Sequence, residues 1–108
     1  MKAQKNGEHL LVYLNGEIDH CCAETLRRDI EDLLRDQKII KLTLDFSRVS
    51  FMDSSGVGML IGRYKTMAAR HGSINAQGLR PPVRKLFHMA GLHRIIAERE
   101  EGRENDEK

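Results

Sequence analysis

The sequence predicts an α/β fold in which helices pack on a largely parallel or mixed sheet. Short apolar runs followed by turn residues indicate strands. They alternate along the chain with segments whose apolar residues recur every three or four positions, as on one face of a helix. The length of 108 residues suits one compact domain, and the content of 40% hydrophobic and 31% charged residues is typical of globular proteins.

The first strand is predicted at residues 9–14, a short apolar run closed by a turn at Asn15 and Gly16. Asp19 is a candidate N-cap for the helix that follows. Charged residues occupy one face of this segment, and the other face is apolar. This pattern predicts an amphipathic helix whose buried stripe holds Ala23, Leu26, Ile30, Leu33 and Leu34.

The second strand is predicted at residues 42–46, where apolar and polar residues alternate, and residues 49–52 lead from it to a loop at 53–56. The segment after the loop again has helical spacing, and it ends at His71 and Gly72. Its apolar face contains Val57, Leu60, Ile61, Tyr64, Met67 and Ala68.

The last part of the chain predicts a strand, a helix and a strand. Residues 73–76 are a strand candidate, and Pro81 and Pro82 suit the first turn of a third helix. Gly91 is a candidate left-handed cap for that helix, and residues 94–97 form the last predicted strand. The inner face of the third helix holds Val83, Leu86, Phe87 and Ala90. We therefore expect the domain to cover residues 1–97.

Residues 98–108 have a different composition. They carry six acidic residues against three basic ones and show no apolar periodicity. Such a segment has no apolar face to bury, so we expect a solvated, disordered tail that folding does not require.

Composition also limits the classes of function. The net charge of +2 is too small to indicate a polyanion partner, and three Phe, two Tyr and no Trp argue against base stacking by single-stranded nucleic acid. Residues 1–8 are polar, so no signal peptide is expected, and no apolar run approaches the roughly 20 residues that span a bilayer. The adjacent Cys21 and Cys22 do not predict a disulfide framework. We expect a soluble cytoplasmic protein.

The most informative segment is residues 51–58, which places Asp53, Ser54 and Ser55 at a strand-to-helix junction. A helix start has unsatisfied N–H groups and the positive end of the helix dipole, so a phosphate on a serine there would be stabilised. Gly56 and Gly58 would let another protein approach the backbone closely. The alternative interpretation is that Ser54 or Ser55 is simply the N-cap of the helix.

Other chemistries fit the sequence poorly. The glycines at 56 and 58 do not form a dinucleotide fingerprint, and no Gly-Lys-Ser or Gly-Lys-Thr sequence follows them. A serine nucleophile would need a base and an orienting acid, and none of the histidines lies in a recognisable catalytic motif. His20, Cys21 and Cys22 are adjacent, which is a poor spacing for tetrahedral metal coordination. We expect no enzyme activity, metal or cofactor.

Four segments together resemble a known family. They are residues 16–20 (Gly-Glu-Ile-Asp-His), residues 23–26, residues 51–65 with the Asp-Ser-Ser-Gly loop, and residues 85–92. In this order and spacing they are similar to bacterial STAS-domain anti-sigma factor antagonists, also called anti-anti-sigma factors, and to the sporulation (anti-sigma-F) type more than to the general-stress type. The resemblance covers residues 8–97. Cys21, Cys22 and the polar segment 73–77 depart from the family pattern.

The resemblance implies a fold and a switch. The fold would be a mixed β-sheet with helices packed mainly on one side. The phosphorylated serine would be Ser54, which directly follows the loop aspartate. The partner would be an anti-sigma factor that is also a serine kinase and uses ATP, and a serine phosphatase would restore the active form. Partner-binding residues carried over from the family are Asp19, Asp53, Ser54, Ser55, Gly56, Val57 and Leu86.

The resemblance leaves one alternative open. The chain could instead be a STAS sensor of small molecules, or a scaffold module of another signalling assembly. A serine next to Asp53 favours the phospho-switch, because a pure sensor has no need of a phosphorylatable hydroxyl there.

Overall fold

The computed structural model describes residues 1–99. Its elements, in chain order, are β1 (Lys2–Asn6), β2 (His9–Ile18), α1 (His20–Leu33), β3 (Lys41–Met52), α2 (Ser54–Ala69), β4 (Ser73–Gln77), α3 (Pro81–Met89), the 3₁₀ helix η1 (Leu92–Arg94) and β5 (Ala97–Arg99).

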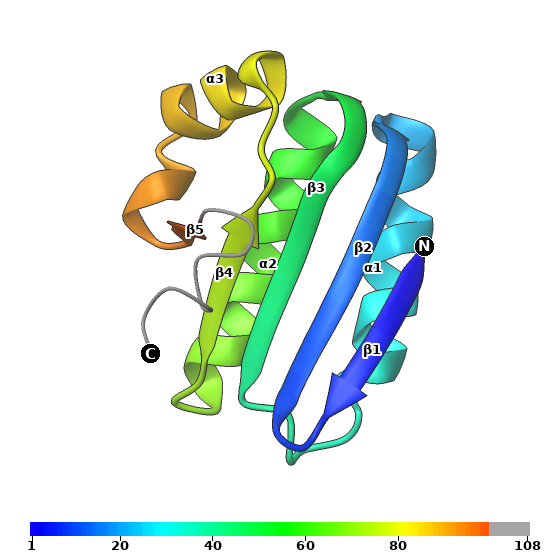
Figure 1. Cartoon of the computed structure of the whole chain (residues 1–108), viewed down its shortest axis with the longest axis vertical. Coiled ribbons are helices and arrows are strands. Elements are labelled where there is room, and N and C mark those ends of the chain that lie inside the picture. The colour runs from blue at the N-terminus through cyan, green and yellow to red at the C-terminus, as the bar shows by residue number, and fades with distance from the viewer. Residues whose placement is uncertain (100–108) are drawn as a thin grey trace.

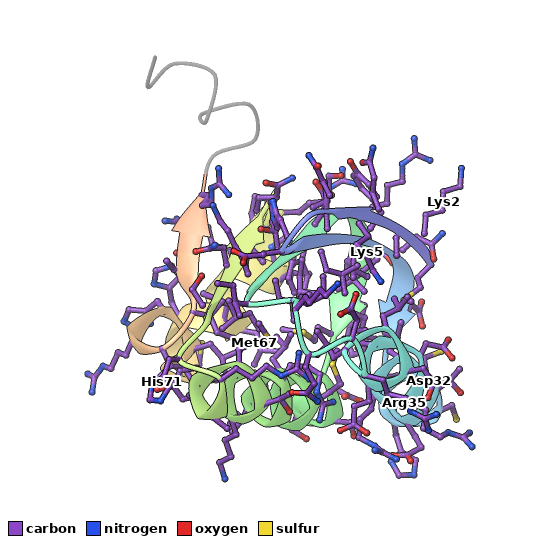
Figure 2. The ribbon with its side chains drawn as sticks, turned by 90° about the horizontal axis from the view of Figure 1, so that it is seen from below. Lys2, Lys5, Asp32, Arg35, Met67 and His71 are labelled. Atoms are coloured by element: carbon purple, nitrogen blue, oxygen red, sulfur yellow. The ribbon has the colours of Figure 1, made fainter. Side chains whose placement is uncertain are left out.

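The strands form one mixed sheet in the order β1-β2-β3-β4-β5. β1 is antiparallel to β2, and the remaining neighbours are parallel. Two successive crossovers, β2-α1-β3 and β3-α2-β4, step in the same direction across the sheet. Because such crossovers share one handedness, α1 and α2 lie on the same face, as Figures 1 and 2 show. The expected fold class, a mixed sheet with helices mainly on one side, is confirmed.

The core lies between the sheet and these two helices. Leu10, Val12 and Leu14 of β2 alternate inward, and every residue of β3 from 42 to 46 is buried. α1 contributes Ile30 and α2 contributes Leu60, both fully buried. Burial of each such side chain stabilises the fold by about 1.5–3 kcal/mol, so this layer holds α1 and α2 against the sheet.

β1 is an element that the sequence analysis missed. All five of its residues are exposed, so it has no apolar alternation to signal a strand. It joins β2 through a two-residue turn in which Gly7 has φ 64°. Lys2 and Lys5 place charges on this edge strand, as edges that avoid aggregation commonly do.

The predicted turn at Asn15 and Gly16 is wrong. β2 continues through both residues to Ile18, with register shifts against β3 on either side of them. Gly16 has φ 80°, a conformation that lets glycine form a bulge within a strand. The bulge carries β2 on to the end of β3.

The C-terminal elements also differ from the prediction. Arg94 belongs to η1, and the last strand begins only at Ala97, where it pairs with β4. Glu98 and Arg99 lie in β5, so ordered structure extends beyond the predicted boundary at residue 97. The rest of the predicted tail, residues 100–108, lies outside the described residues.

Candidate functional site

β2 and β3 end side by side, and this pairing brings the starts of two helices together. Ile18 is the register partner of Met52, and the N–H of Asp53 donates to the carbonyl of Ile18 at 3.3 Å. Asp19 and Asp53 are the residues that follow these two strands. The structure therefore places the beginnings of α1 and α2 at one end of the sheet, the upper end in Figure 1.

Asp53 is the N-cap of α2. Its backbone is extended (φ −116°, ψ −168°), and its carboxylate accepts a hydrogen bond from the N–H of Ser55 at 2.9 Å. The interpretation of Ser54 or Ser55 as the cap is therefore wrong. Aspartate is among the best N-cap residues, and here it leaves Ser54 at the first helical position.

The two serines of the loop have different surroundings. Ser54 is exposed, and its hydroxyl makes no hydrogen bond to any of residues 1–99, whereas Ser55 is half-buried. Ser54 opens a 16-residue helix whose first turn holds no acidic residue. The negative charge at this helix start is therefore that of the Asp53 cap alone, and the first turn itself adds none.

Asp19 is the N-cap of α1, as Asp53 is of α2. Its carboxylate accepts hydrogen bonds from the N–H groups of Cys21 and Cys22, each at 3.0 Å. The bond from the Cys22 N–H is the main cause that lowers the pKa of Asp19, and a hydrogen bond to Asp19 raises the pKa of the Cys22 thiol. This edge of the site therefore carries an ionised carboxylate in a fixed orientation.

The two loop glycines have different roles. A Cβ on Gly56 would lie 2.5 Å from Cγ of Met52 and 3.1 Å from Cγ2 of Ile18. Gly56 is buried, so it is required for packing of α2 on the sheet and offers no open surface to a partner. A Cβ on Gly58 would meet no atom within 4 Å, and Gly58 is exposed. Of these two glycines, Gly58 is the one that another protein could approach closely.

The remaining predicted site residues are apolar. Val57 is half-buried in the first turn of α2, beside the loop. Leu86 is half-buried on α3, which lies at the same end of the sheet in Figure 1 but is a separate element. The sequence analysis did not assign Phe51, whose side chain is 47% exposed only three residues before Ser54. Because Met52 points toward the helices, strand alternation could have signalled that Phe51 points outward.

Other classes of site find no support among residues 1–99. No group of His, Cys, Asp and Glu there could hold a metal ion, and Cys21 and Cys22 are exposed free thiols. No helix in the described part of the chain is long and apolar enough to cross a membrane.

Comparison with known proteins shows the family and the fold of the chain. The sequence model of the STAS domain family matches residues 1–105 of this chain. The anti-sigma F factor antagonist of Paenibacillus polymyxa is 33% identical over 100 residues, which cover 89% of this chain and 86% of the relative. The anti-sigma-B factor antagonist of Listeria monocytogenes is 30% identical over 93 residues, which cover 86% of this chain and 81% of the relative.

Two solved structures are also similar. The anti-sigma factor antagonist SpoIIAA in its unphosphorylated form superposes with a TM-score of 0.83 at 31% identity, covering 98% of this chain and 93% of that one. The phosphorylated form of SpoIIAA, described as a Bacillus cell fate determinant, gives a TM-score of 0.75 at 30% identity, covering 98% and 96%.

Proposed function

This chain belongs to the STAS-domain family and is an anti-sigma factor antagonist, and we propose that phosphorylation of Ser54 switches its activity off. The unphosphorylated chain captures an anti-sigma factor and thereby frees the sigma factor. The anti-sigma factor is also the serine kinase, which uses ATP, and a separate serine phosphatase reverses the modification. The chain is then a substrate of both enzymes in the cytoplasm.

The observation that carries the proposal is the division of roles between Asp53 and Ser54. Asp53 caps the helix, so the Ser54 hydroxyl is not needed for that purpose and makes no hydrogen bond to residues 1–99. An exposed, uncommitted hydroxyl can enter a kinase active site without unfolding of the helix. Ser55 is half-buried and its N–H is bound to Asp53, which makes it a poorer acceptor of a phosphoryl group.

A phosphate at this position is compatible with the fold. It adds about −1.5 to −2 charges and three acceptor oxygens at a helix start, where a negative charge is favourable. The first turn of α2 holds no acidic residue, and the neighbouring carboxylate of Asp53 is already bound to the Ser55 N–H. We therefore expect the phosphorylated chain to keep its structure.

Phosphorylation would, however, change the surface that the anti-sigma factor meets. Asp19 and Asp53 are both fixed by backbone hydrogen bonds, so the unphosphorylated surface is rigid and loses little entropy on binding. A phosphate between partner and chain would be desolvated without a counter-charge. That costs several kcal/mol, on the order of 10³-fold or more in affinity, so no large rearrangement is required.

The experiment that tests the proposal is phosphate mapping. The purified chain is incubated with its cognate anti-sigma factor and ATP, and the product is analysed by mass spectrometry. We expect a single phosphate on Ser54 and none in the Ser54→Ala variant. A phosphate on Ser55 would overturn the assignment of the residue, and no phosphate with a kinase that is active on a control substrate would overturn the switch and favour a sensor or scaffold role.

A further inference from the structure

The acidic and basic residues of this chain are strongly segregated. Residues 54–97, which run from the start of α2 to the first residue of β5, contain no Asp or Glu. They contain seven basic residues other than histidine: Arg63, Lys65, Arg70, Arg80, Arg84, Lys85 and Arg94. Two of the seven serve the fold, since Arg63 is buried against Glu31, and Arg70 donates to the carbonyls of Asp36 and Ile39 between α1 and β3.

Most of the other five basic residues lie on α3 or close to it in sequence. A hollow of about 400 Å³ lies on the outer side of this helix, and its lining consists of Leu79, Pro81, Arg84, Lys85, His88 and Met89. Pro81, Lys85 and Met89 recur at four-residue spacing, so they form one row along the helix, and Arg84 and His88 form the next row. We call this surface the α3 face.

The α3 face is both apolar and basic. The Met89 side chain is 76% exposed, the most exposed large apolar residue in the described part of the chain. Lys85 is exposed and has no ion pair with any of residues 1–99. Buried residues of α3, Val83 and Phe87, attach the helix to the core, so the outward rows are not needed for packing.

The structure contains a carboxylate bound to this face. Glu98 of β5, the first acidic residue after the acid-free stretch, accepts a hydrogen bond from Nε of Arg84 at 2.7 Å and pairs with Nε2 of His88. The ring of His88 in turn stacks on that of His93 at a centroid distance of 4.5 Å. The α3 face thus binds one carboxylate within the chain while Lys85 and Met89 remain open beside it.

We propose that the α3 face is a second docking surface for the anti-sigma factor, and that it binds an acidic segment with an exposed apolar side chain. The inference rests on the proposed function, because the partner is the same. The carboxylates of that segment lie against Lys85 and Arg84, and its apolar side chain covers Met89. α3 lies at the same end of the sheet as the start of α2 in Figure 1, so one partner can contact both surfaces.

The chemistry favours a protein over a nucleic acid or a lipid surface. The lining offers only a few cations and no Phe, Tyr or Trp ring for base stacking, and the exposed thioether of Met89 suits an apolar side chain. Charges at the rim of an interface mainly steer association, whereas buried apolar contacts mainly slow dissociation. Lys85 and Met89 should therefore affect different rate constants.

The test measures both rate constants with purified anti-sigma factor over a range of salt concentrations. Lys85→Glu should lower the association rate constant about fivefold at low salt, and the difference should shrink at high salt. Lys41→Glu is the matched control, because it makes the same charge change on an exposed residue at the opposite end of β3. Met89→Ala should raise the dissociation rate constant about threefold with little change in association.

Each result decides the proposal. Equal effects of Lys85→Glu and Lys41→Glu, together with no effect of Met89→Ala, would overturn the second docking surface and leave the proposed function standing. Failure of the wild-type chain to bind the anti-sigma factor would overturn both. Binding of duplex DNA or phosphatidylserine vesicles that is lost in Lys85→Glu, with anti-sigma kinetics unchanged, would assign the face to a polyanion and overturn the proposal.

Discussion

The carboxylate of Asp53 accepts a hydrogen bond from the backbone N–H of Ser55 at 2.9 Å, and this contact defines the start of α2. It predicts unequal effects of two neighbouring substitutions. Asp53→Ala should lower the free energy of unfolding by about 0.5–2 kcal/mol, because it removes the cap. Ser54→Ala should change it by less than about 0.5 kcal/mol, since the exposed hydroxyl makes no hydrogen bond to residues 1–99. Urea unfolding of both variants checks this, and a larger loss for Ser54→Ala would show that Ser54 supports the helix.

Charge at position 54 should act on binding rather than on stability. Ser54→Asp should fold like the wild type, because a negative charge in the first turn of a helix is favourable. It should nevertheless weaken binding to the anti-sigma factor, by less than phosphorylation does, since aspartate carries a smaller charge than phosphate. Calorimetric titration and melting curves on the same samples check this. Wild-type affinity in Ser54→Asp would move the assignment to Ser55.

The two glycines at the start of α2 should respond in opposite ways to alanine. Gly56→Ala places a Cβ 2.5 Å from Met52, so the helix must shift, and we expect a loss of about 1–3 kcal/mol in the free energy of unfolding. Gly58→Ala meets no neighbour and should be neutral or stabilising by up to about 1 kcal/mol, because alanine favours the helix. Chemical denaturation measures both, and equal losses would contradict the packing role of Gly56.

The pair formed by Arg63 and Glu31 joins α2 to α1. The Arg63 side chain is 5% exposed and donates to the Glu31 carboxylate at 2.6 Å, while its Nε and Nη1 have no partner among the described residues. Glu31→Ala should therefore cost about 1–3 kcal/mol, because it leaves the buried Arg63 charge unpaired, while the 40% exposure of Glu31 keeps the loss below that of a fully buried pair. Arg63→Met should cost far less or even stabilise, and Glu24→Ala, which removes a surface pair with Arg27, is the control at under about 1 kcal/mol. If Arg63→Met is as damaging as Glu31→Ala, the pair itself is stabilising.

Asp45 should contribute to the pH dependence of stability. It is 1% exposed, and although burial raises its pKa, hydrogen bonds from Ser47 and Gln77 outweigh this effect and hold the pKa below its ordinary value. A carboxyl with a lowered pKa in the folded state stabilises the fold above its unfolded pKa of about 4, and this stabilisation is lost as the pH falls through the lowered pKa. Asp45→Asn should be less stable at neutral pH and should lose less stability on acidification. Unfolding measured at neutral and acidic pH checks this, and parallel pH profiles would contradict it.

Much of the fold and of the site could be predicted because the relevant signals are local. The apolar stripe of α1 and its cap Asp19 are properties of adjacent residues, and the structure has both. The parallel pairing of β2 with β3 then places Asp19 beside the Asp53 loop, as alternation of strands and helices implies.

The features that could not be predicted depend on tertiary context. β1 has no buried residue, so only its pairing with β2 makes it a strand. Gly16 has the same sequence signal whether it forms a turn or a bulge, and the length of β3 beside it decides in favour of the bulge. The choice of Asp53 over the serines as cap depends on where β3 ends, and the packing role of Gly56 depends on Met52 and Ile18.

The central claim is that a phosphate on Ser54 abolishes capture of the anti-sigma factor without unfolding the chain. The most direct measurement is calorimetric titration of the same anti-sigma factor with unphosphorylated chain and with chain phosphorylated only on Ser54. Melting curves of both forms show whether the fold is intact. We predict that the phosphorylated form melts as the unphosphorylated form does but binds on the order of 10³-fold more weakly or not at all. Equal affinity of the two forms would contradict the account.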